Sequence, residues 1–328
     1  MRTRRLGRVG PQVSAISMGR GNQAIQFDDQ DMVRAFNATI RRAFDLGINF
    51  FDSSDAYWGA RHEVLLGRAI KGFRDRILIS SKFGNLDLPD GRKGANGRPE
   101  YLRQCCEDSL KRMGVDAIDV YYQHRVDPAV PIEETVGAMA RLIDEGKVRY
   151  LGLCEAGPAT LKRAYKTHPI VALQSEYSLW FRENERDILP VCRELGIAYV
   201  AYAPLGRGLL TGRIKTVDDL AATDRRRRHP RFQPENLATN VKLVEELEAI
   251  AKGQGITTAQ LALAWVLAQG EDIIPIPGTN QVKNVELNAA AADIRLSGEK
   301  VARLSRIFAI GAGAGKRYQE NALKGVGI

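Results

Sequence analysis

The sequence is poor in the residues that build metal centres and disulfide frameworks. Its 328 residues include only four cysteines and four histidines. Cys105 and Cys106 are adjacent, while Cys154 and Cys192 are isolated, so the cysteines lack the spacing of zinc ligands. No apolar run reaches the roughly 20 residues that span a bilayer. A secretory signal has an apolar segment after its basic N-terminus, and the basic N-terminus of this sequence is not followed by one. We therefore expect a cytoplasmic protein with reduced thiols, no metal and no membrane association.

Two phosphate-binding glycine motifs are also missing. Gly19 and Gly21 lack the third glycine of a dinucleotide-binding G-x-G-x-x-G loop. The segment 311–316, GAGAGK, has Ile310 before it and Arg317 after it, where a phosphate loop needs glycine and a hydroxyl residue. It also follows an expected helix instead of a strand. This argues against a doubly wound sheet, and we expect 311–316 to be a flexible connection to the C-terminal tail.

What the chain does have is an apolar content sufficient for a large core and an excess of positive charge. Hydrophobic residues make up 44% of the sequence and charged residues 27%, and the net charge is +9. Basic proteins bind anionic partners, either nucleic acids or phosphorylated small molecules. The densest basic run, 225–228, has no aromatic residues interleaved and belongs to no nucleic-acid motif. We expect a solvated loop there and no nucleic-acid partner.

Short β-rich runs alternate with amphipathic helical segments along the whole chain. Eight strands with helices between them over about 300 residues predict a (β/α)8 barrel. Residues 4–16 resemble a small hairpin that would plug the bottom of the barrel, and helices at 282–291 and 297–308 would close the chain. We expect one domain, 1–328. The predicted strands are 13–18, 48–52, 77–82, 117–123, 148–154, 170–175, 198–203 and 272–276. The other predicted helices are 31–46, 61–72, 99–113, 132–145, 158–167, 184–195, 241–253 and 258–268.

Polar residues follow the predicted strands at the end where barrel enzymes place their active sites. The second strand ends at Asp52 with Tyr57 just beyond, the third at Lys82, and the fourth runs into His124. A phenol has a pKa of about 10, which a neighbouring ammonium group lowers. We expect Lys82 to act on Tyr57 in this way, Asp52 to orient Lys82, and His124 to bind a substrate oxygen.

This set of groups is suited to protonating a carbonyl oxygen as it becomes an alcohol. An alternative is a lyase in which Lys82 forms a Schiff base with a carbonyl substrate. That alternative leaves Gln174 and Tyr202, at the ends of later strands, without a task.

The ordered motifs resemble those of the aldo-keto reductase family along nearly the whole chain. NFFDSSDAY carries Asp52 and Tyr57, SSKFG carries Lys82, and DVYYQHRVDP carries His124. The segments GKVRYLGLCEA, LQSEYSLW, AYAPLGRGLLTG and IPIPGT follow in the order of the family. The resemblance implies NADPH-dependent reduction of an aldehyde or ketone, with Tyr57 as proton donor. It also leaves open a nucleotide-sensing regulatory subunit on the same fold.

The resemblance further implies a set of cofactor-binding residues. Tyr202 would stack on the nicotinamide, Gln174 and Cys154 would bind its carboxamide, and glycines would let backbone N–H groups approach phosphate. The full expected set is Gly19, Gly21, Asp52, Cys154, Glu155, Gln174, Tyr202, Pro204, Leu205, Gly206, Gly208, Leu210, Ile276, Gly278, Thr279, Asn280, Gln281, Lys283, Glu286 and Asn288.

Two residues depart from the family pattern. Cys154 replaces the usual serine, and a thiol is a weaker hydrogen-bonding group. Asn280 and Gln281 stand where related chains commonly have Lys-Arg, which would recognise the 2′-phosphate of NADPH. Lys283 or the run 225–228 is the expected substitute, and NADH is the alternative cofactor. For the small-molecule carbonyl substrate, the expected pocket residues are Trp58, Phe83 and Arg125.

Overall fold

The computed structural model of the protein describes residues 1–88, 93–323 and 325–328. Its centre is a curled, entirely parallel sheet of seven strands in the order β11-β10-β9-β8-β7-β4-β3. These strands are rich in β-branched and aromatic residues and are buried on both faces, as parallel strands usually are. They are β3 (Phe50–Asp52), β4 (Leu78–Phe83), β7 (Ile118–Gln123), β8 (Val148–Cys154), β9 (Ile170–Glu176), β10 (Ala198–Tyr202) and β11 (Ile273–Pro275).

The barrel is closed by a few residues that form no regular strand. Met18 bridges Phe51 of β3, and Gly19 bridges Gly278 beyond β11, both in parallel. Hydrogen bonds from Ser17 N to the Pro275 carbonyl (3.0 Å) and from Met18 N to the Phe50 carbonyl (2.9 Å) complete the junction. Sequence analysis predicted a barrel strand over 13–18, and this was wrong in extent, because the first of these residues belong to the preceding hairpin.

The N-terminal hairpin was predicted correctly and fills the barrel interior. Strands β1 (Thr3–Arg5) and β2 (Gln12–Ser14) pair antiparallel. Leu6 and Val13 are fully buried in one cluster with side chains from the barrel strands, among them Phe50. Phe51, the next residue, belongs to the larger core cluster between strands and helices. Successive residues of a strand face opposite sides. Phe50 therefore packs inside the barrel, and Phe51 packs between the strands and the helices.

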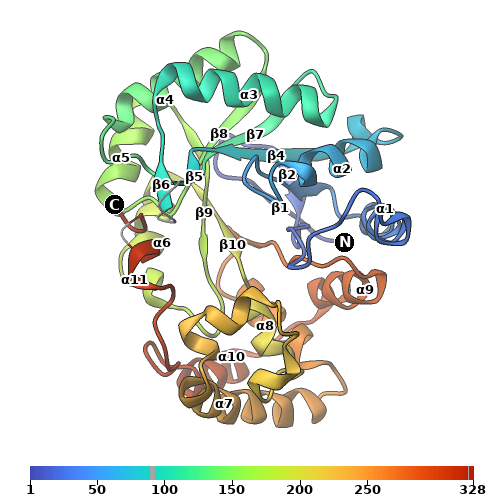
Figure 1. Ribbon diagram of the computed structural model, residues 1–328. Coiled ribbons are helices and arrows are strands. Elements are labelled where there is room, and N and C mark those ends of the chain that lie inside the picture. Colours follow the sequence, from blue (N-terminus) through green and yellow to red (C-terminus); the bar gives the residue numbers. More distant parts are fainter. Residues whose placement is uncertain (89–92, 324) are drawn as a thin grey trace.

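Helices surround the barrel and pack on its outer face (Figure 1). Their starts follow local signals: Asp29 caps α1, Pro99 opens α3, and Thr257 with Gln260 forms a capping box on α8. Helix α7 begins at Pro234, earlier than the predicted 241. The helices are α1 (Gln30–Asp45), α2 (Arg61–Ile70), α3 (Pro99–Met113), α4 (Ile132–Asp144), α5 (Pro158–Thr167), α6 (Ile188–Leu195), α7 (Pro234–Lys252), α8 (Thr258–Leu267), α9 (Val282–Ala290), α10 (Gly298–Ile307) and α11 (Glu320–Leu323).

Two segments beyond the strand ends take shapes that the sequence did not indicate. A second hairpin, β5 (Asn85–Asp87) with β6 (Lys93–Ala95), follows β4. The run 225–228 forms a short 3₁₀ turn in which Arg226 pairs with Asp224 and donates to the Arg207 carbonyl. Within the described residues, no helix is long and apolar enough to cross a membrane.

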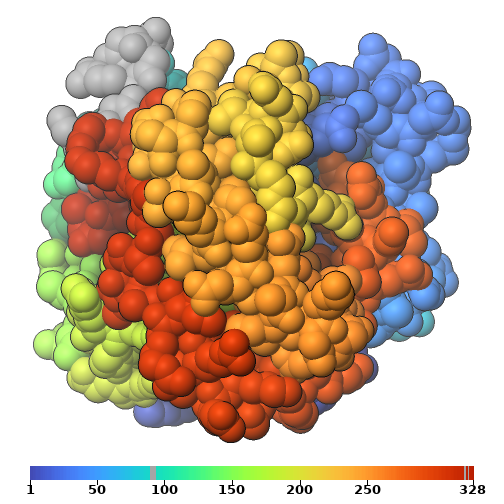
Figure 2. Space-filling view, turned by 90° about the horizontal axis from the view of Figure 1, so that it is seen from below, coloured from blue at the N-terminus to red at the C-terminus, as the bar shows by residue number. Residues whose placement is uncertain are grey.

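The connection at 311–316 is packed, although sequence analysis predicted it to be flexible. Asn240 of α7 donates to the Ala314 carbonyl at 3.0 Å and accepts from the Ala314 N–H at 2.8 Å. A side chain at Gly313 would collide with Trp180, and one at Gly315 with Arg231. Figure 2 shows the C-terminal residues, in red, lying against the orange segment that includes α7. Glycine is required here for close approach, so the glycines indicate tight packing.

Candidate active site

Asp52, Tyr57 and Lys82 meet at the C-terminal ends of β3 and β4. The Lys82 ammonium lies 2.6 Å from Asp52 Oδ2, 2.6 Å from the Ser53 carbonyl and 3.2 Å from the Tyr57 hydroxyl. Strands β3 and β4 are adjacent and parallel, so their last residues lie at one edge. The Tyr57 ring packs edge-on against His124, with ring centroids 5.9 Å apart. The four residues expected from the sequence are therefore brought together.

The Asp52 carboxylate is bound on several sides. Ser80 Oγ donates to Oδ1 at 2.8 Å and Gln174 Nε2 donates to the same oxygen at 2.9 Å. Both Asp52 and Lys82 are buried, with side-chain exposures of 2% and 0%. A buried carboxylate needs such donors because an unpaired one is costly. These hydrogen bonds fix the orientation of the Asp52–Lys82 pair. One of them comes from Gln174, which lies on the far side of the sheet.

Burial and charge set the protonation of this centre. Burial raises the pKa of Tyr57, and the nearby Lys82 offsets this only in part. The net direction is thus opposite to the lowering expected from the sequence. Burial disfavours the Lys82 ammonium, but the Asp52 carboxylate outweighs it and raises the Lys82 pKa. Tyr57 therefore keeps its proton and Lys82 its charge at neutral pH.

Two serines of the same loop position the histidines, a role that sequence analysis did not assign. Ser54 Oγ lies 3.1 Å from His124 Nδ1, and Ser53 Oγ lies 2.8 Å from His62 Nδ1. His62 is fully enclosed, and burial lowers its pKa to about 3, so it stays neutral. Serine after a strand is common in turns, so the sequence held no signal for these contacts.

A large cavity opens beside these residues. Its volume is about 880 Å³, within the usual range of roughly 300–1,000 Å³ for ligand sites. Tyr57 and His124 line one end of it. The expected cofactor and substrate residues that also line it are Gly19, Asp52, Cys154, Gln174, Tyr202, Pro204, Leu205, Gly208, Ile276, Gly278, Thr279, Asn288 and Arg125.

The other expected residues lie away from the cavity lining. Glu155 is paired with Arg317, and Glu286 is paired with Arg42 at 2.8 Å. Asn280 packs against Gly21 and donates to the Gln23 carbonyl. Gln281 and Lys283 are exposed, whereas Gly206 and Leu210 are buried. Trp58 packs on Phe36 and His62, and Phe83 stacks on Tyr121 in the core.

The cavity also has lining residues that sequence analysis did not identify. Arg20 follows the barrel-closing residues, and Arg207 lies in the loop after β10. Glu155, Ala203 and Arg207 have positive φ angles of 54°, 48° and 58°. Such angles are strained for residues with a side chain and tend to gather at functional sites. The unexpected lining residues include Arg20, Asn22, Ala203, Arg207, Thr211, Arg213, Lys252, Thr257, Asn284 and Leu287. Arg226, from the run 225–228 that was expected as a substitute for Lys-Arg, also lines the cavity.

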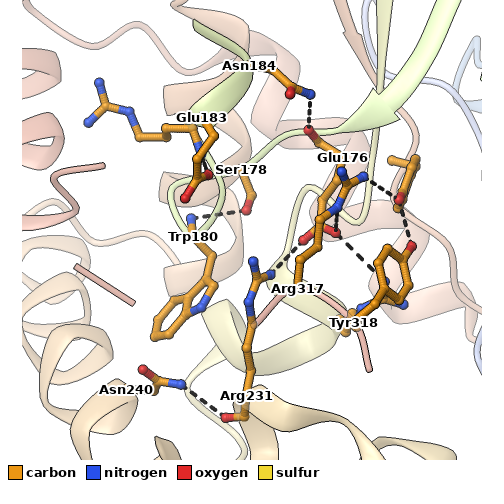
Figure 3. Close-up of polar contacts among 12 residues, drawn as sticks. Glu176, Ser178, Trp180, Glu183, Asn184, Arg231, Asn240, Arg317 and Tyr318 are labelled. Atoms are coloured by element: carbon orange, nitrogen blue, oxygen red, sulfur yellow. Dashed lines mark hydrogen bonds and ion pairs between the residues drawn. The ribbon is translucent and has the colours of Figure 1, made fainter. Parts of the chain in front are cut away.

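A second buried charge cluster borders the cavity, and Figure 3 shows it. Glu176, at the end of β9, accepts from Arg231 at 2.7 Å and from Arg317 at 2.9 Å. Burial opposes its charge, yet these arginines lower the pKa of Glu176 to about 2. Arg317 also donates to the Tyr202 hydroxyl at 2.7 Å, and Tyr202 is 2.7 Å from the Tyr318 hydroxyl. The C-terminal tail is thus attached to the cavity wall.

The chain resembles known proteins over almost its full length. The model of the aldo/keto reductase family matches residues 16–309. A "probable aldo-keto reductase 1" of soybean (Glycine max) is 46% identical over 317 residues, which cover 96% of this chain and 91% of the relative.

Solved structures agree with this assignment. A glycerol dehydrogenase of Gluconobacter oxydans is 28% identical, with a TM-score of 0.83 over 94% of this chain and 95% of the other. An aldo-keto reductase of Klebsiella pneumoniae in complex with NADPH is also 28% identical, with a TM-score of 0.74 over 94% and 96%. Together with the parallel barrel and the strand-end Asp52, Tyr57, Lys82 and His124, these matches establish that the chain belongs to the aldo/keto reductase family.

Proposed function

We propose that the protein is an NADPH-dependent carbonyl reductase in which Tyr57 gives the proton. The observation that carries the proposal is the contact of the Tyr57 hydroxyl with Lys82 at 3.2 Å, at the wall of the cavity. When bound, the reduced nicotinamide supplies the hydride. A tyrosine whose pKa is raised by burial retains its proton and is able to donate it to a carbonyl oxygen.

The volume of the cavity and the basic residues that line it support a dinucleotide ligand. Gly19 and Gly278 both line the cavity, and their backbones lie so close together that neither position has room for a side chain. Arg213 and Lys252 line the cavity and form no ion pair with any carboxylate of the described residues, so their charges are available to phosphates. The exposed Tyr202 face suits a flat ring.

Each residue of the proton-donating group has a separate task in this proposal. Asp52 holds Lys82 charged and in place, and Lys82 stabilises the phenolate that forms as Tyr57 loses its proton. His124, held by Ser54, donates a hydrogen bond to the carbonyl oxygen. Gln174 ties the far strand to Asp52 and is positioned to bind the carboxamide of the nicotinamide.

The Schiff-base alternative is disfavoured by the state of Lys82. A lysine must be neutral to attack a carbonyl carbon. Burial next to Asp52 instead raises the Lys82 pKa and keeps the amine protonated. Its side chain is also fully buried.

The test is to mix the protein with NADPH or NADH and a panel of aldehydes and ketones, and to follow nicotinamide absorbance. We expect oxidation of NADPH by at least one carbonyl class, and Tyr57→Phe to lower the rate by about 10²- to 10⁴-fold with little change in NADPH affinity. Tyr165→Phe, on α5 away from the cavity, is the control. Tight NADPH binding without turnover would instead favour the nucleotide-sensing subunit, and a borohydride-trapped lysine adduct would favour the lyase.

A further inference from the structure

Two arginines flank the proposed proton-donating group and lack a carboxylate partner. The Arg20 guanidinium lies over the Tyr57 ring, 4.7 Å from its centroid. Arg125 directly follows His124 and donates to the His124 carbonyl at 2.7 Å. Both side chains line the cavity. Tyr57 and His124 are the two groups that would face a carbonyl oxygen. Tyr57 therefore has the Arg20 cation beside it, and His124 has the Arg125 cation beside it.

Neither arginine has a carboxylate counter-ion among the described residues. Within the described part of the chain, no carboxylate lies within ion-pair distance of Arg20 or Arg125. By contrast, Arg226 pairs with Asp224 at 2.7 Å, and Arg317 pairs with Glu176 at 2.9 Å. Of the arginines that line the cavity, Arg207 and Arg226 thus have a carboxylate within ion-pair distance, whereas Arg20, Arg125 and Arg213 have none among the described residues.

The carboxylates that line the cavity are already engaged. Asp52 is bound by Lys82 at 2.6 Å, and Glu248 by Lys215 at 2.6 Å. Asp219 accepts from the backbone N–H groups of Lys215 and Thr216. A partly buried guanidinium without a counter-ion is costly and attracts an anion from outside. Such an anion has to arrive with a ligand.

Of the two ligands that enter the cavity, the substrate is the better match for these arginines. The segment after β10, where the cofactor phosphates are proposed to lie, supplies its own arginines to the cavity, Arg207 and Arg213. Arg125 instead lies beside His124, and it lines the cavity together with Tyr202 and Tyr318. Guanidinium groups bind planar anions such as carboxylates through two parallel hydrogen bonds.

We propose that the preferred substrates are aldehydes or ketones that carry an anionic group, foremost a carboxylate, which Arg125 binds with the help of Arg20. This inference rests on the proposed carbonyl reductase activity and names the substrate class of the same site. A phosphate offers the same charge and oxygen geometry, so phosphorylated carbonyl compounds form a separate arm of the test.

The experiment compares matched substrate pairs at saturating NADPH. 4-Oxobutanoate is compared with its methyl ester, 4-carboxybenzaldehyde with benzaldehyde, and glyceraldehyde 3-phosphate with glyceraldehyde. We expect kcat/KM to favour the charged member of the carboxylate pairs by about 10- to 100-fold, the range of a charge-assisted hydrogen bond. Arg125→Gln should abolish this preference, with a loss of kcat/KM on the charged substrates at least about tenfold larger than the loss on the neutral ones. Arg125→Lys should retain part of it, and Arg20→Gln should weaken it.

Controls separate this inference from the proposed function. Arg163→Gln, which removes an exposed arginine on α5, should change neither substrate class. Equal turnover of charged and neutral substrates by the wild type, or equal losses on both in Arg125→Gln, would overturn the inference while leaving the reductase intact. A weaker NADPH affinity of Arg125→Gln, measured by fluorescence quenching without substrate, would assign Arg125 to the cofactor and overturn it too. A preference for the phosphate pair alone would replace the carboxylate with a phosphate. Absence of any turnover would refute the reductase itself.

Discussion

Asp52 and Glu176 are both buried carboxylates at the ends of barrel strands, and they organise two different kinds of centre. Asp52 pairs with one lysine and accepts from neutral donors, and a tyrosine hydroxyl adjoins the pair. Glu176 pairs with two arginines, and a third, Arg207, lies 3.8 Å away. The first centre faces the cavity with the Tyr57 hydroxyl, the proposed proton donor. The second has no such group among its ion pairs and binds distant segments together.

We infer from this difference that the Asp52 centre serves catalysis and that the Glu176 centre serves the stability of the fold. A single cation next to Asp52 leaves the Tyr57 hydroxyl sensitive to the local charge. Several arginines around Glu176 lower its pKa to about 2, so the cluster is ionised throughout the physiological range. Mutations in the first centre should therefore change rates, and mutations in the second should change stability.

The largest effect is expected from Lys82→Met. It removes the charge that stabilises the phenolate of Tyr57, and we expect carbonyl reduction to fall by as much as about 10⁴-fold. Single-turnover oxidation of NADPH measures the loss, and circular dichroism checks that the variant is folded. A folded Lys82→Met protein with a rate within tenfold of the wild type would contradict the role of Lys82 in proton transfer.

In the second centre, the mutation that corresponds to Lys82→Met is Glu176→Gln, which should lower stability. It leaves buried arginines without their counter-ion, and we expect the free energy of unfolding to fall by about 3–5 kcal/mol. Urea denaturation at pH 7 measures it. Glu133→Gln, which breaks the exposed pair with Arg163, is the control and should cost at most about 1 kcal/mol.

The pH dependence of this loss gives a further check. Because the Glu176 pKa is lowered, its stabilisation is present above the ordinary pKa of about 4.5 and fades as the pH falls toward 2. The difference between the wild type and Glu176→Gln should shrink over the same range. A difference that stays constant from pH 7 to pH 3 would show that the loss has another origin.

Asp55 provides a carboxylate with no ion pair among the described residues, and it sharpens the comparison. Burial, with Glu63 nearby, raises the pKa of Asp55 to about 6, against the weaker pull of Arg112 and Ser54. A raised pKa means that ionisation above pH 6 costs stability, whereas below about pH 4 the group is neutral in both states. Asp55→Asn should therefore be more stable than the wild type at pH 8, by on the order of 1 kcal/mol. The gain should vanish at pH 4, and urea titrations at both pH values decide the matter.

The smallest effect should come from Tyr318→Phe, at a residue that lies between the Glu176 centre and the cavity. It removes the hydrogen bond to the Tyr202 hydroxyl but leaves the one from Arg317. Loss of a neutral hydrogen bond is worth about 0.5–1.5 kcal/mol, so the Kd for NADPH should rise by less than about tenfold. Fluorescence titration measures it. If the Glu176 centre has no influence on the cavity, the Kd will not change at all.

The barrel and the four candidate catalytic positions could be predicted because the signals are local. Each strand is a short apolar run, and each candidate residue follows one of them. Parallel strands place these ends together without any knowledge of the packing. Asp52 and Lys82 are only 30 residues apart and lie on neighbouring strands.

The Glu176 centre could not be predicted because its partners are remote and the sequence near them points elsewhere. Arg231 lies next to a basic run whose pattern predicts a solvated loop. Arg317 follows a glycine-rich segment whose pattern predicts flexibility. The residues 17–19 that close the barrel were predicted only as the end of a longer strand, 13–18, and the extent was wrong for a related reason. A bridge of two residues is too short to show strand periodicity, and only its neighbours on both sides define it.

The pairing of Glu176 also constrains the order in which the protein is made. Its partners Arg231 and Arg317 are synthesised 55 and 141 residues later. A nascent chain that has completed β9 therefore holds a carboxylate that stays hydrated until Arg231 is made, and its pairing is complete only after Arg317 has been added. The Tyr202 hydroxyl also gains its hydrogen-bond partners only after Arg317 and Tyr318 have been synthesised. We expect this end of the cavity to form last, so that an incomplete chain does not present a finished site.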